Sequence, residues 1–438
     1  MARPARLLVL ALVASLVLCG PAAAVDRYLP MKGAPAPGPA RYDRVWVQQL
    51  GPRDFERVVV LVPGTNGGAG SITTVARDIV RRVPRTQVWI VDRRQQAFED
   101  TEVFERRDPD AALDHYLGFK YRRVLGEDAR FAAEWGLRVQ LADLRRVVRR
   151  AGRGGREVVL GGHSAGASTA VAYAAWDFAG RAGWRDLDGL VLIDGGLLGS
   201  FAEANAGRAR RELADIRAGD VFLDLLGVGI PEVAGIFAQV GALFAYERPD
   251  APSTLQGFPL LPDVFKPPFP VTNEAQFGYA FDASTSPRDL ALIHIRAGEL
   301  AGSGDPRPWQ DGEVTPIRRF ARAFAGTRPN ATEWYYPRRL LLDIDAANEL
   351  RMTPAARLLG LRLRHGRTIR LPLYAYGTGL TRGRVAAGAR RLANFSRIEE
   401  FSITDDRGMS HLDPLAAAPR RNDFLKSVVP FLKRIRSR

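Results

Sequence analysis

The sequence predicts an α/β fold, with a mostly parallel sheet, helices on both of its faces and a large, mainly helical insertion. Short runs rich in β-branched and other apolar residues alternate with helical stretches, which is the pattern of a parallel sheet covered on both sides. The alternation stops near Leu197 and returns near Leu371. Since the same pattern resumes after the break, we expect the intervening residues to form a cap or lid rather than a second independent domain.

Each element follows from the spacing of apolar residues and from turn residues. The first buried strand, 58–62, consists of Val-Val-Val-Leu-Val and is stopped by Pro63-Gly64. The other expected strands are 88–91, 158–160, 189–193, 371–376 and 398–403. The expected helices of the sheet domain are 71–83, 137–150, 165–179, 384–392 and 423–435. Within the interruption, 221–246 and 316–324 have helical character and strand-like runs are few.

These elements divide the chain into four parts. Residues 1–24 are expected to be an export signal, and 25–44 an N-terminal linker that contains the Pro/Ala/Gly run 33–40. Residues 45–196 together with 371–438 are expected to form the sheet domain. Residues 197–370 are the expected cap insertion.

The N-terminus has the pattern of a secretory signal. Arg3 and Arg6 precede the apolar run 7–18, and Ala22-Ala23-Ala24 offers a cleavage site after Ala24. The apolar run is about 12 residues, whereas about 20 are needed to cross a bilayer, so an uncleaved membrane anchor is less favoured. The protein is therefore expected to be secreted or extracytoplasmic. Cleavage would remove the one cysteine, Cys19, which excludes disulfides, thiol catalysis and cysteine-ligated metals in the mature chain.

Composition and charge restrict the classes of partner. Apolar residues make up 46% of the 438 residues, enough for a substantial core, and the formal net charge is +15. The excess charge is nearly all arginine and is scattered along the chain, whereas nucleic-acid binders concentrate it on one face. We therefore expect no nucleic-acid partner, although the charge leaves room for weak association with anionic envelope surfaces.

One motif carries the strongest chemical signal. Gly162-His163-Ser164-Ala165-Gly166 matches G-x-S-x-G and stands between an expected strand and an expected helix. In that setting a tight strand-to-helix turn lifts the serine hydroxyl above the sheet, and the glycines two positions away make the turn possible. The motif therefore predicts Ser164 as a catalytic nucleophile. The competing interpretation is a glycine-rich turn that merely packs a helix on a strand.

A serine hydroxyl needs a base to take its proton, and His411 is the candidate. It lies in the loop between the last expected strand and the last expected helix. With Ser164 in its elbow, this arrangement resembles the α/β-hydrolase family, whose base occupies that loop and whose catalytic residues follow the order serine, acid, histidine. The resemblance covers residues 45–200 and 370–435 and implies a serine hydrolase of the esterase or lipase type.

The acid that orients the histidine is less clearly marked. The family usually places it after the penultimate strand, where this chain has Tyr376-Gly377-Thr378-Gly379 and no acid. Some members place it after the strand that follows the nucleophile helix, and the residue there is Asp194, our candidate. The alternatives kept open are Asp405, Asp406, Asp343 and Asp345, while Asp413 is expected to cap the turn after His411.

Acyl transfer also requires hydrogen-bond donors for the developing oxyanion. The N–H of Ala165, directly after the nucleophile, is one candidate. The resemblance implies that the other lies in the loop after the first strand, where Pro63-Gly64 stands in the place of the family's His-Gly pair. Thr65 is the expected donor, with Asn66 as an alternative, and the segment Asp92-Arg93-Arg94 is interpreted as structural.

Several competing functions remain or are excluded. The glycine spacing after the first strand does not give G-x-G-x-x-G, which argues against a dinucleotide site, and the proposed chemistry requires no cofactor and no metal. Two alternatives stay open: an acyltransferase with the same catalytic residues, and a non-catalytic binding protein with the same fold. The sequence does not determine the oligomeric state.

The substrate class is suggested by the insertion. Its residues 221–226, 236–237 and 243–244 are strongly apolar, and aromatic residues follow at 334–336. We expect them to line an acyl pocket, which favours hydrophobic esters or lipids as substrates. The alternative is that these residues only form the core of the cap itself.

Overall fold

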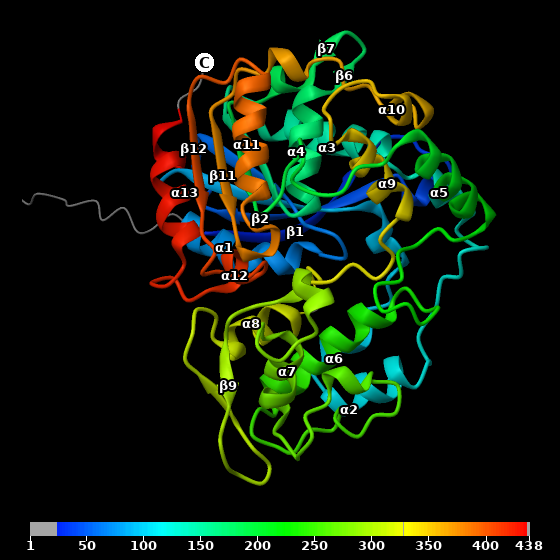
Figure 1. Cartoon of the computed structure of the whole chain (residues 1–438), viewed down its shortest axis with the longest axis vertical. Helices are drawn as coiled ribbons and strands as arrows, with labels where there is room; N and C mark the ends of the chain where they lie inside the picture. The colour runs from blue at the N-terminus through cyan, green and yellow to red at the C-terminus, as the bar shows by residue number, and fades with distance from the viewer. Residues whose placement is uncertain (1–23, 327, 436–438) are drawn as a thin grey trace, which may run out of the picture.

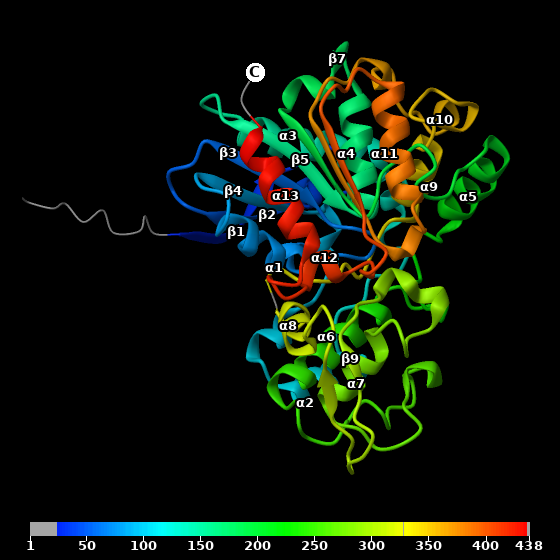
Figure 2. The ribbon, with the colours of Figure 1, turned by 60° about the vertical axis from the view of Figure 1, so that its left-hand side comes forward.

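A central sheet forms the upper lobe of the molecule, and a mainly helical cap lies below it (Figures 1 and 2). The computed structural model describes residues 24–326 and 328–435, and the structural statements below refer to these residues. The expected export signal therefore lies almost entirely outside them. Among the described residues, no helix has the length and apolar character that crossing a membrane requires.

The sheet contains eight strands in the order β1-β2-β4-β3-β5-β8-β11-β12. The pairs β1–β2 and β2–β4 are antiparallel, and the five other pairs are parallel. The strands are β1 (Val25–Lys32), β2 (Arg44–Gly51), β3 (Arg57–Val62), β4 (Thr86–Asp92), β5 (Glu157–His163), β8 (Gly189–Ile193), β11 (Leu373–Gly377) and β12 (Phe401–Asp405). The predicted fold class, a mostly parallel sheet with helices on both faces, is confirmed.

The two faces of the sheet are covered by different helices. Side chains alternate along β3, so that Val58, Val60 and Val62 pack on one face and Val59 and Leu61 on the other. The helices on the first face are α3 (Leu137–Ala151), α4 (Ala165–Ala175) and α11 (Arg384–Phe395). Those on the second face are α1 (Ala69–Val80) and α13 (Asp423–Arg434). Both faces of the central strands are thus removed from water, which explains their continuous apolar runs.

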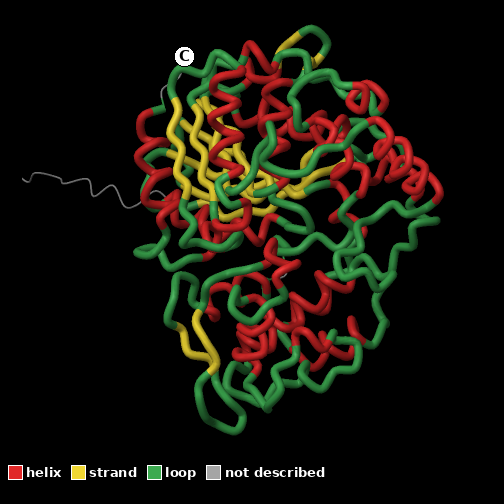
Figure 3. Tube along the Cα trace, viewed as in Figure 1, coloured by secondary structure: helices red, strands yellow, loops and turns green. Residues whose placement is uncertain are grey.

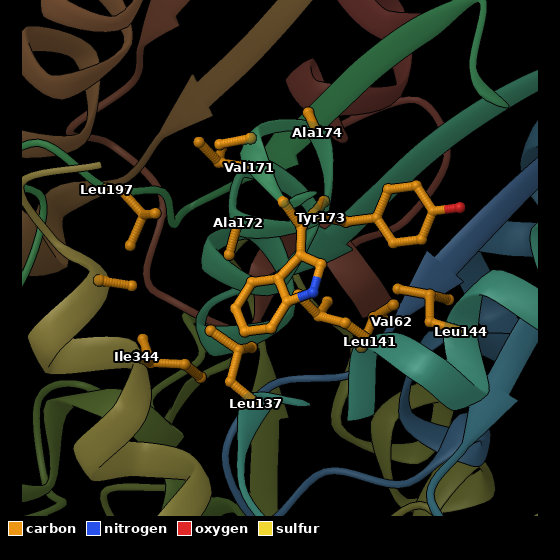
Figure 4. Packing of buried hydrophobic residues seen from close by; sticks show 14 of the residues in the cluster. Val62, Leu137, Leu141, Leu144, Val171, Ala172, Tyr173, Ala174, Leu197 and Ile344 are labelled. Carbon is orange, nitrogen blue, oxygen red and sulfur yellow. The ribbon is translucent and has the colours of Figure 1, made fainter. Parts of the chain in front are cut away.

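Figure 4 shows the core of the first face from close by. Tyr173 and Val171 of α4 belong to one hydrophobic cluster with Leu141 and Leu144 of α3 and Val62 of β3. All five side chains are fully buried. This packing holds α4 firmly against the sheet and, with it, the turn that begins the helix.

The cap is built from two segments of the chain rather than one. Its own core combines residues of 98–139 with residues of 221–335. Figure 3 shows that this lower lobe consists mainly of helices and loops. Its elements are α2 (Pro109–Ala112), α6 (Val233–Glu247), α7 (Asn273–Phe281), β9 (Gly298–Leu300), β10 (Trp309–Asp311) and α8 (Ile317–Phe324). The prediction that 45–196 belongs wholly to the sheet domain is therefore wrong for the segment after β4, because its aromatic residues Phe98, Phe104 and Tyr116 pack into the cap.

The insertion in turn contributes to the sheet domain. Three of its helices, α5 (Ala206–Ala218), α9 (Arg338–Ala347) and α10 (Pro354–Leu358), lie beside the upper lobe in Figure 1. Their apolar residues, such as Leu213, Leu340 and Ala356, join the same core as α3 and α4. The expected boundary of the cap at 197–370 is therefore too wide, since hydrophobic contacts, not chain order, divide the two lobes.

The N-terminal part also differs from the expected linker. Val25–Lys32 of the predicted linker 25–44 forms the edge strand β1, in register with β2 from Val25 opposite Gly51 to Lys32 opposite Arg44. The Pro/Ala/Gly run after it has no regular structure up to Pro39 but is anchored. Ala34 N–H donates to Asp143 at 2.6 Å, and Arg94 donates to the Ala34 carbonyl at 2.8 Å.

One helix is shorter than its sequence suggested. The helix expected at 165–179 ends at Ala175, because the following residues turn back in a small hairpin of β6 (Asp177–Phe178) and β7 (Arg181–Ala182). The last short helix before α13 is α12 (Asp413–Ala416).

Candidate active site

Ser164 occupies a strained turn between β5 and α4. Its φ of 53° and ψ of −123° lie in a region that residues with a side chain rarely adopt. The two glycines of the motif have no room for a side chain: a Cβ on Gly166 would lie 2.0 Å from the carbonyl oxygen of Val62, and one on Gly162 would lie 2.4 Å from the carbonyl carbon of Gly166. The close contact of β3, β5 and α4 therefore requires both glycines and holds the turn in place.

Asp194 directly follows β8 and also has a positive φ, 43°. Its carboxylate is fully buried, and Oδ2 accepts a hydrogen bond from Nδ1–H of His411 at 2.5 Å. Thr378 donates from its main-chain N–H to Oδ1 at 2.8 Å and from its hydroxyl to Oδ2. Burial alone would raise the pKa of Asp194, but the interactions with His411 and Thr378 outweigh it and hold the pKa below its ordinary value. The carboxylate is thus charged and accepts hydrogen bonds at both oxygens.

His411 lies in the loop between β12 and α12 and is only 2% exposed. The loop is pinned by Asp413, whose carboxylate accepts from Ser410 N–H at 2.7 Å, from Arg296 N–H at 2.9 Å and from the Thr315 hydroxyl at 2.6 Å. Asp413 therefore holds the turn, as expected, and at the same time ties it to the cap. Because both partners of the Asp194–His411 pair are anchored separately, the imidazole has a defined orientation.

The other acids considered from sequence lie elsewhere. Asp406 accepts from the Tyr376 hydroxyl, Asp405 pairs with Arg407, and Asp343 accepts from Leu137 N–H and from Arg339. Asp345 pairs with Arg208 at 2.8 Å. Within the described part of the chain, the carboxylate that hydrogen-bonds the His411 ring is that of Asp194.

A second imidazole lies beside His411, a contact that sequence reasoning missed. The rings of His163 and His411 are 4.3 Å apart between centroids, and Nε2–H of His163 donates to the main-chain carbonyl of His411 at 3.0 Å. Burial and the neighbouring His411 lower the pKa of His163 to about 3. His163 is therefore neutral at physiological pH and can donate this hydrogen bond without adding charge to the site.

The loop after β3 lies against the serine. A Cβ on Gly64 would come 2.9 Å from Cβ of Ser164 and 3.2 Å from Nδ1 of His163, so only glycine fits there. Next along the loop, the main-chain N–H groups of Thr65 and Asn66 donate no hydrogen bond within the described residues. Ala165 is the first residue of α4, where N–H groups have no acceptor within the helix. Three residues whose N–H groups have no acceptor in the described chain thus line the same cavity as Ser164.

A buried ion pair supports this loop from below. Arg93 and Glu333 are both about 1% exposed at their side chains and lie 2.6 Å apart. Arg93 also donates to the carbonyl oxygens of Pro63 and Gly64, while the main chain of Glu333 exchanges hydrogen bonds with Asn66. Arg93 was interpreted from sequence as structural. Its hydrogen bonds turn the carbonyl groups of Pro63 and Gly64 towards its guanidinium, so the N–H groups of this loop can face Ser164.

Ser164 and His411 line the same cavity, of about 550 Å³, which extends into the cap. Gly64, Thr65 and Ala165 form part of its wall near the serine. The cap side is largely aromatic and aliphatic, and includes Phe237, Phe244, Leu255, Phe277, Phe281 and Phe324. A cavity of this size, with mostly apolar walls and a few polar groups, is typical of a small-molecule site. The described residues contain no cluster of three or more potential metal ligands.

Comparisons with known proteins agree with this fold. No family model matches the sequence, and no curated protein matches it. Among solved structures, a candidate lipase from Sulfolobus solfataricus is similar at a TM-score of 0.53 and 15% identity, over 93% of this chain and 94% of that chain. Epoxide Hydrolase A from Mycobacterium thermoresistibile (TM-score 0.44, 14% identity, 94% and 100% covered) and a thermophilic esterase from Thermogutta terrifontis (0.41, 12%, 93% and 98%) also match. The chain has the α/β-hydrolase fold.

Proposed function

We propose that the chain is a serine hydrolase that cleaves carboxylic esters with hydrophobic acyl groups. One observation carries the proposal: Ser164, on its strained turn, and His411, hydrogen-bonded to Asp194, line the same largely apolar cavity. A nucleophile, a base and an orienting carboxylate from three separate loops are what acyl transfer through a covalent intermediate requires.

In the proposed reaction, Ser164 Oγ attacks the ester carbonyl carbon while Nε2 of His411 takes its proton. Asp194 keeps Nδ1 of His411 protonated and stabilises the imidazolium that forms. The bond between the carbonyl carbon and the alcohol oxygen then breaks, and His411 returns the proton to the leaving alkoxide. Water attacks the acyl-enzyme in the same way and releases the carboxylic acid and free Ser164.

The negative charge on the carbonyl oxygen would be stabilised by main-chain donors. We assign this role to the N–H groups of Ala165 and Thr65, with Asn66 N–H as the alternative second donor. In related enzymes, removing one such donor lowers kcat about 10²–10³-fold. Their position next to Ser164, and the ion pair of Arg93 with Glu333 beneath the loop, support the assignment.

Fluorophosphonate labelling tests the nucleophile directly. We expect stoichiometric labelling at Ser164 and loss of labelling in Ser164→Ala and His411→Ala, both of which should remain folded by circular dichroism. A chain-length series of p-nitrophenyl esters, with amides and peptides as controls, tests the substrate class. Long-chain esters should be preferred, and equal turnover of short and long esters would remove support for the hydrophobic pocket. A folded protein that is not labelled would be a binding protein instead.

The same site would also pass its acyl group to an alcohol. Product analysis in the presence of a competing alcohol distinguishes the two outcomes: hydrolysis gives the free acid, while an acyltransferase gives mainly the new ester.

Export is part of the proposal. Cleavage after Ala24 would leave Val25 as the first residue, and Val25 is the buried first residue of β1, so the mature chain would keep the whole sheet. Mass spectrometry of protein recovered outside the cytoplasm should find Val25 at the N-terminus, whereas an intact N-terminus would contradict cleavage there.

A further inference from the structure

The apolar cavity contains one polar atom in the cap without a protein partner. Two residues that line the cavity have buried side-chain atoms with no hydrogen bond in the described chain: Asn66 Oδ1, in the loop after β3, and Gln276 Oε1, on α7. Gln276 is only 4% exposed, and Leu255, Phe265 and Phe277 line the same cavity. An unpaired amide oxygen in such surroundings is costly, and buried polar groups normally have a partner.

The orientation of the Gln276 amide follows from its other end. Its Nε2–H donates to the carbonyl oxygen of Phe265 at 2.6 Å. A carbonyl oxygen accepts only, so the nitrogen must face Phe265 and the oxygen must be the free end. The free group is therefore an acceptor, which pairs with a donor and not with another carbonyl.

The neighbouring polar side chains make their hydrogen bonds elsewhere. Asn273, also on the cavity wall, uses Nδ2–H for the carbonyl of Arg248 at 2.9 Å and Oδ1 for the N–H of Thr254 at 3.3 Å. The Ser253 Oγ on the same wall accepts from Gln256 N–H at 3.2 Å. The hydrogen bonds of Asn273 and Ser253 therefore lie within the cap loops, and Gln276 Oε1 has no partner among the described residues.

We propose that Gln276 makes this enzyme selective for acyl groups that carry a hydroxyl along an otherwise apolar chain. This inference rests on the proposed ester hydrolysis and adds the class of acyl group. Oε1 has no partner in the described chain, and a plain acyl chain in the cavity supplies none. A hydroxyl on the chain donates to Oε1, so the hydroxylated chain gains a hydrogen bond that the plain chain lacks.

The test uses esters that differ at one carbon. The hydroxyl is moved along the chain of p-nitrophenyl dodecanoate, and kcat/KM is compared with the plain ester and with the keto ester at the same carbon. We expect an optimum at one interior position, where the hydroxyl raises kcat/KM about five- to tenfold over the plain chain. The keto analogue, which cannot donate, should be no better than the plain chain. Equal rates for the hydroxy and keto esters would refute the inference.

Gln276→Met removes the acceptor at nearly constant volume and should abolish the preference between hydroxylated and plain esters. The ratio of rates is the readout, because a loosened cap would affect both esters alike. Gln239→Met is the matched control: Gln239 is fully buried in the cap on α6 but does not line the cavity, and its Oε1 accepts from Trp334. This variant should keep the preference, and losing it in both variants would contradict the role of Gln276.

Binding to Ser164→Ala separates this inference from the proposed function. Calorimetry should show tighter binding of the hydroxylated dodecanoate than of dodecanoate, and equal binding after Gln276→Met in the same background. If no ester is hydrolysed, the proposed function fails, while the binding comparison still decides the role of Gln276. If esters are hydrolysed without preference and binding is equal, only the hydroxyl selectivity is refuted.

Discussion

Asparagine at position 194 would keep the size of the side chain while reversing one hydrogen bond. Since the Thr378 N–H needs an oxygen opposite it at 2.8 Å, the asparagine carbonyl must replace Oδ1, and the amide nitrogen then faces His411. An N–H at this place turns His411 Nδ1 into an acceptor and moves the ring proton to Nε2. Nε2 is the atom that has to take the proton from Ser164, so the base is lost although the geometry is kept.

The expected loss is large. The same change of tautomer in serine protease triads lowers kcat by roughly 10⁴-fold, which corresponds to about 5 kcal/mol of activation free energy. We expect a decrease of that order in kcat for Asp194→Asn with p-nitrophenyl decanoate, and at least as great a loss for Ser164→Ala and His411→Ala.

Asp406→Asn is the matched control, because Asp406 bonds to Tyr376 and makes no hydrogen bond with the ring of His411. It should stay within a few-fold of the native rate, and circular dichroism should show that both variants are folded. Full activity in Asp194→Asn would refute the reasoning and redirect the search for the acid to Asp405 or Asp406.

Three further predictions concern the support of the site. Thr378→Val removes the hydroxyl that donates to Asp194 but keeps the N–H, and should lower kcat about tenfold with KM nearly unchanged in steady-state assays. An unaltered kcat would mean that the hydroxyl does not matter. The pKa of His163 is about 3 in the folded chain against 6.5 for the free side chain, so the unfolded chain takes up a proton as the pH falls below 6.5 and the folded chain does not. Stability should therefore fall by about 2 kcal/mol from pH 8 to pH 5, and urea titrations of His163→Gln should lack this part of the decrease. Gly166→Ala forces a Cβ to within 2.0 Å of a backbone oxygen and should lower the unfolding free energy by roughly 2–4 kcal/mol, whereas Gly257→Ala, with no atom within 4 Å, should leave the melting temperature nearly unchanged.

Two residues of the candidate site could be predicted from local sequence patterns. Ser164 could be found because its motif describes a single turn, and the turn has the strained conformation that the motif implies. His411 could be found because its loop stands between the last strand and the last long helix. Both conclusions needed only neighbouring residues and the order of elements along the chain.

Thr378 and His163 could not be found in this way. Thr378 stands after β11, where the family usually has its catalytic acid and this chain has none. β11 is the parallel neighbour of β8, which ends just before Asp194. The two strand ends therefore lie side by side, and the threonine completes the carboxylate site from the adjacent strand. The only signal was the unexplained absence of an acid after that strand. The contact of His163 with the backbone of His411 had no signal at all.

The sequence by itself determined the class of fold and the turn that carries Ser164. Apolar periodicity is a local property, and a strand buried on both faces must be apolar along its whole length. The tertiary structure alone decided which parts form the cap, since Phe98, Phe104 and Tyr116 pack there although they follow β4 in the chain. It also decided the cavity and the free oxygen of Gln276. Contacts between residues far apart in sequence depend on how whole elements pack, and no pattern within one segment records its partner in another.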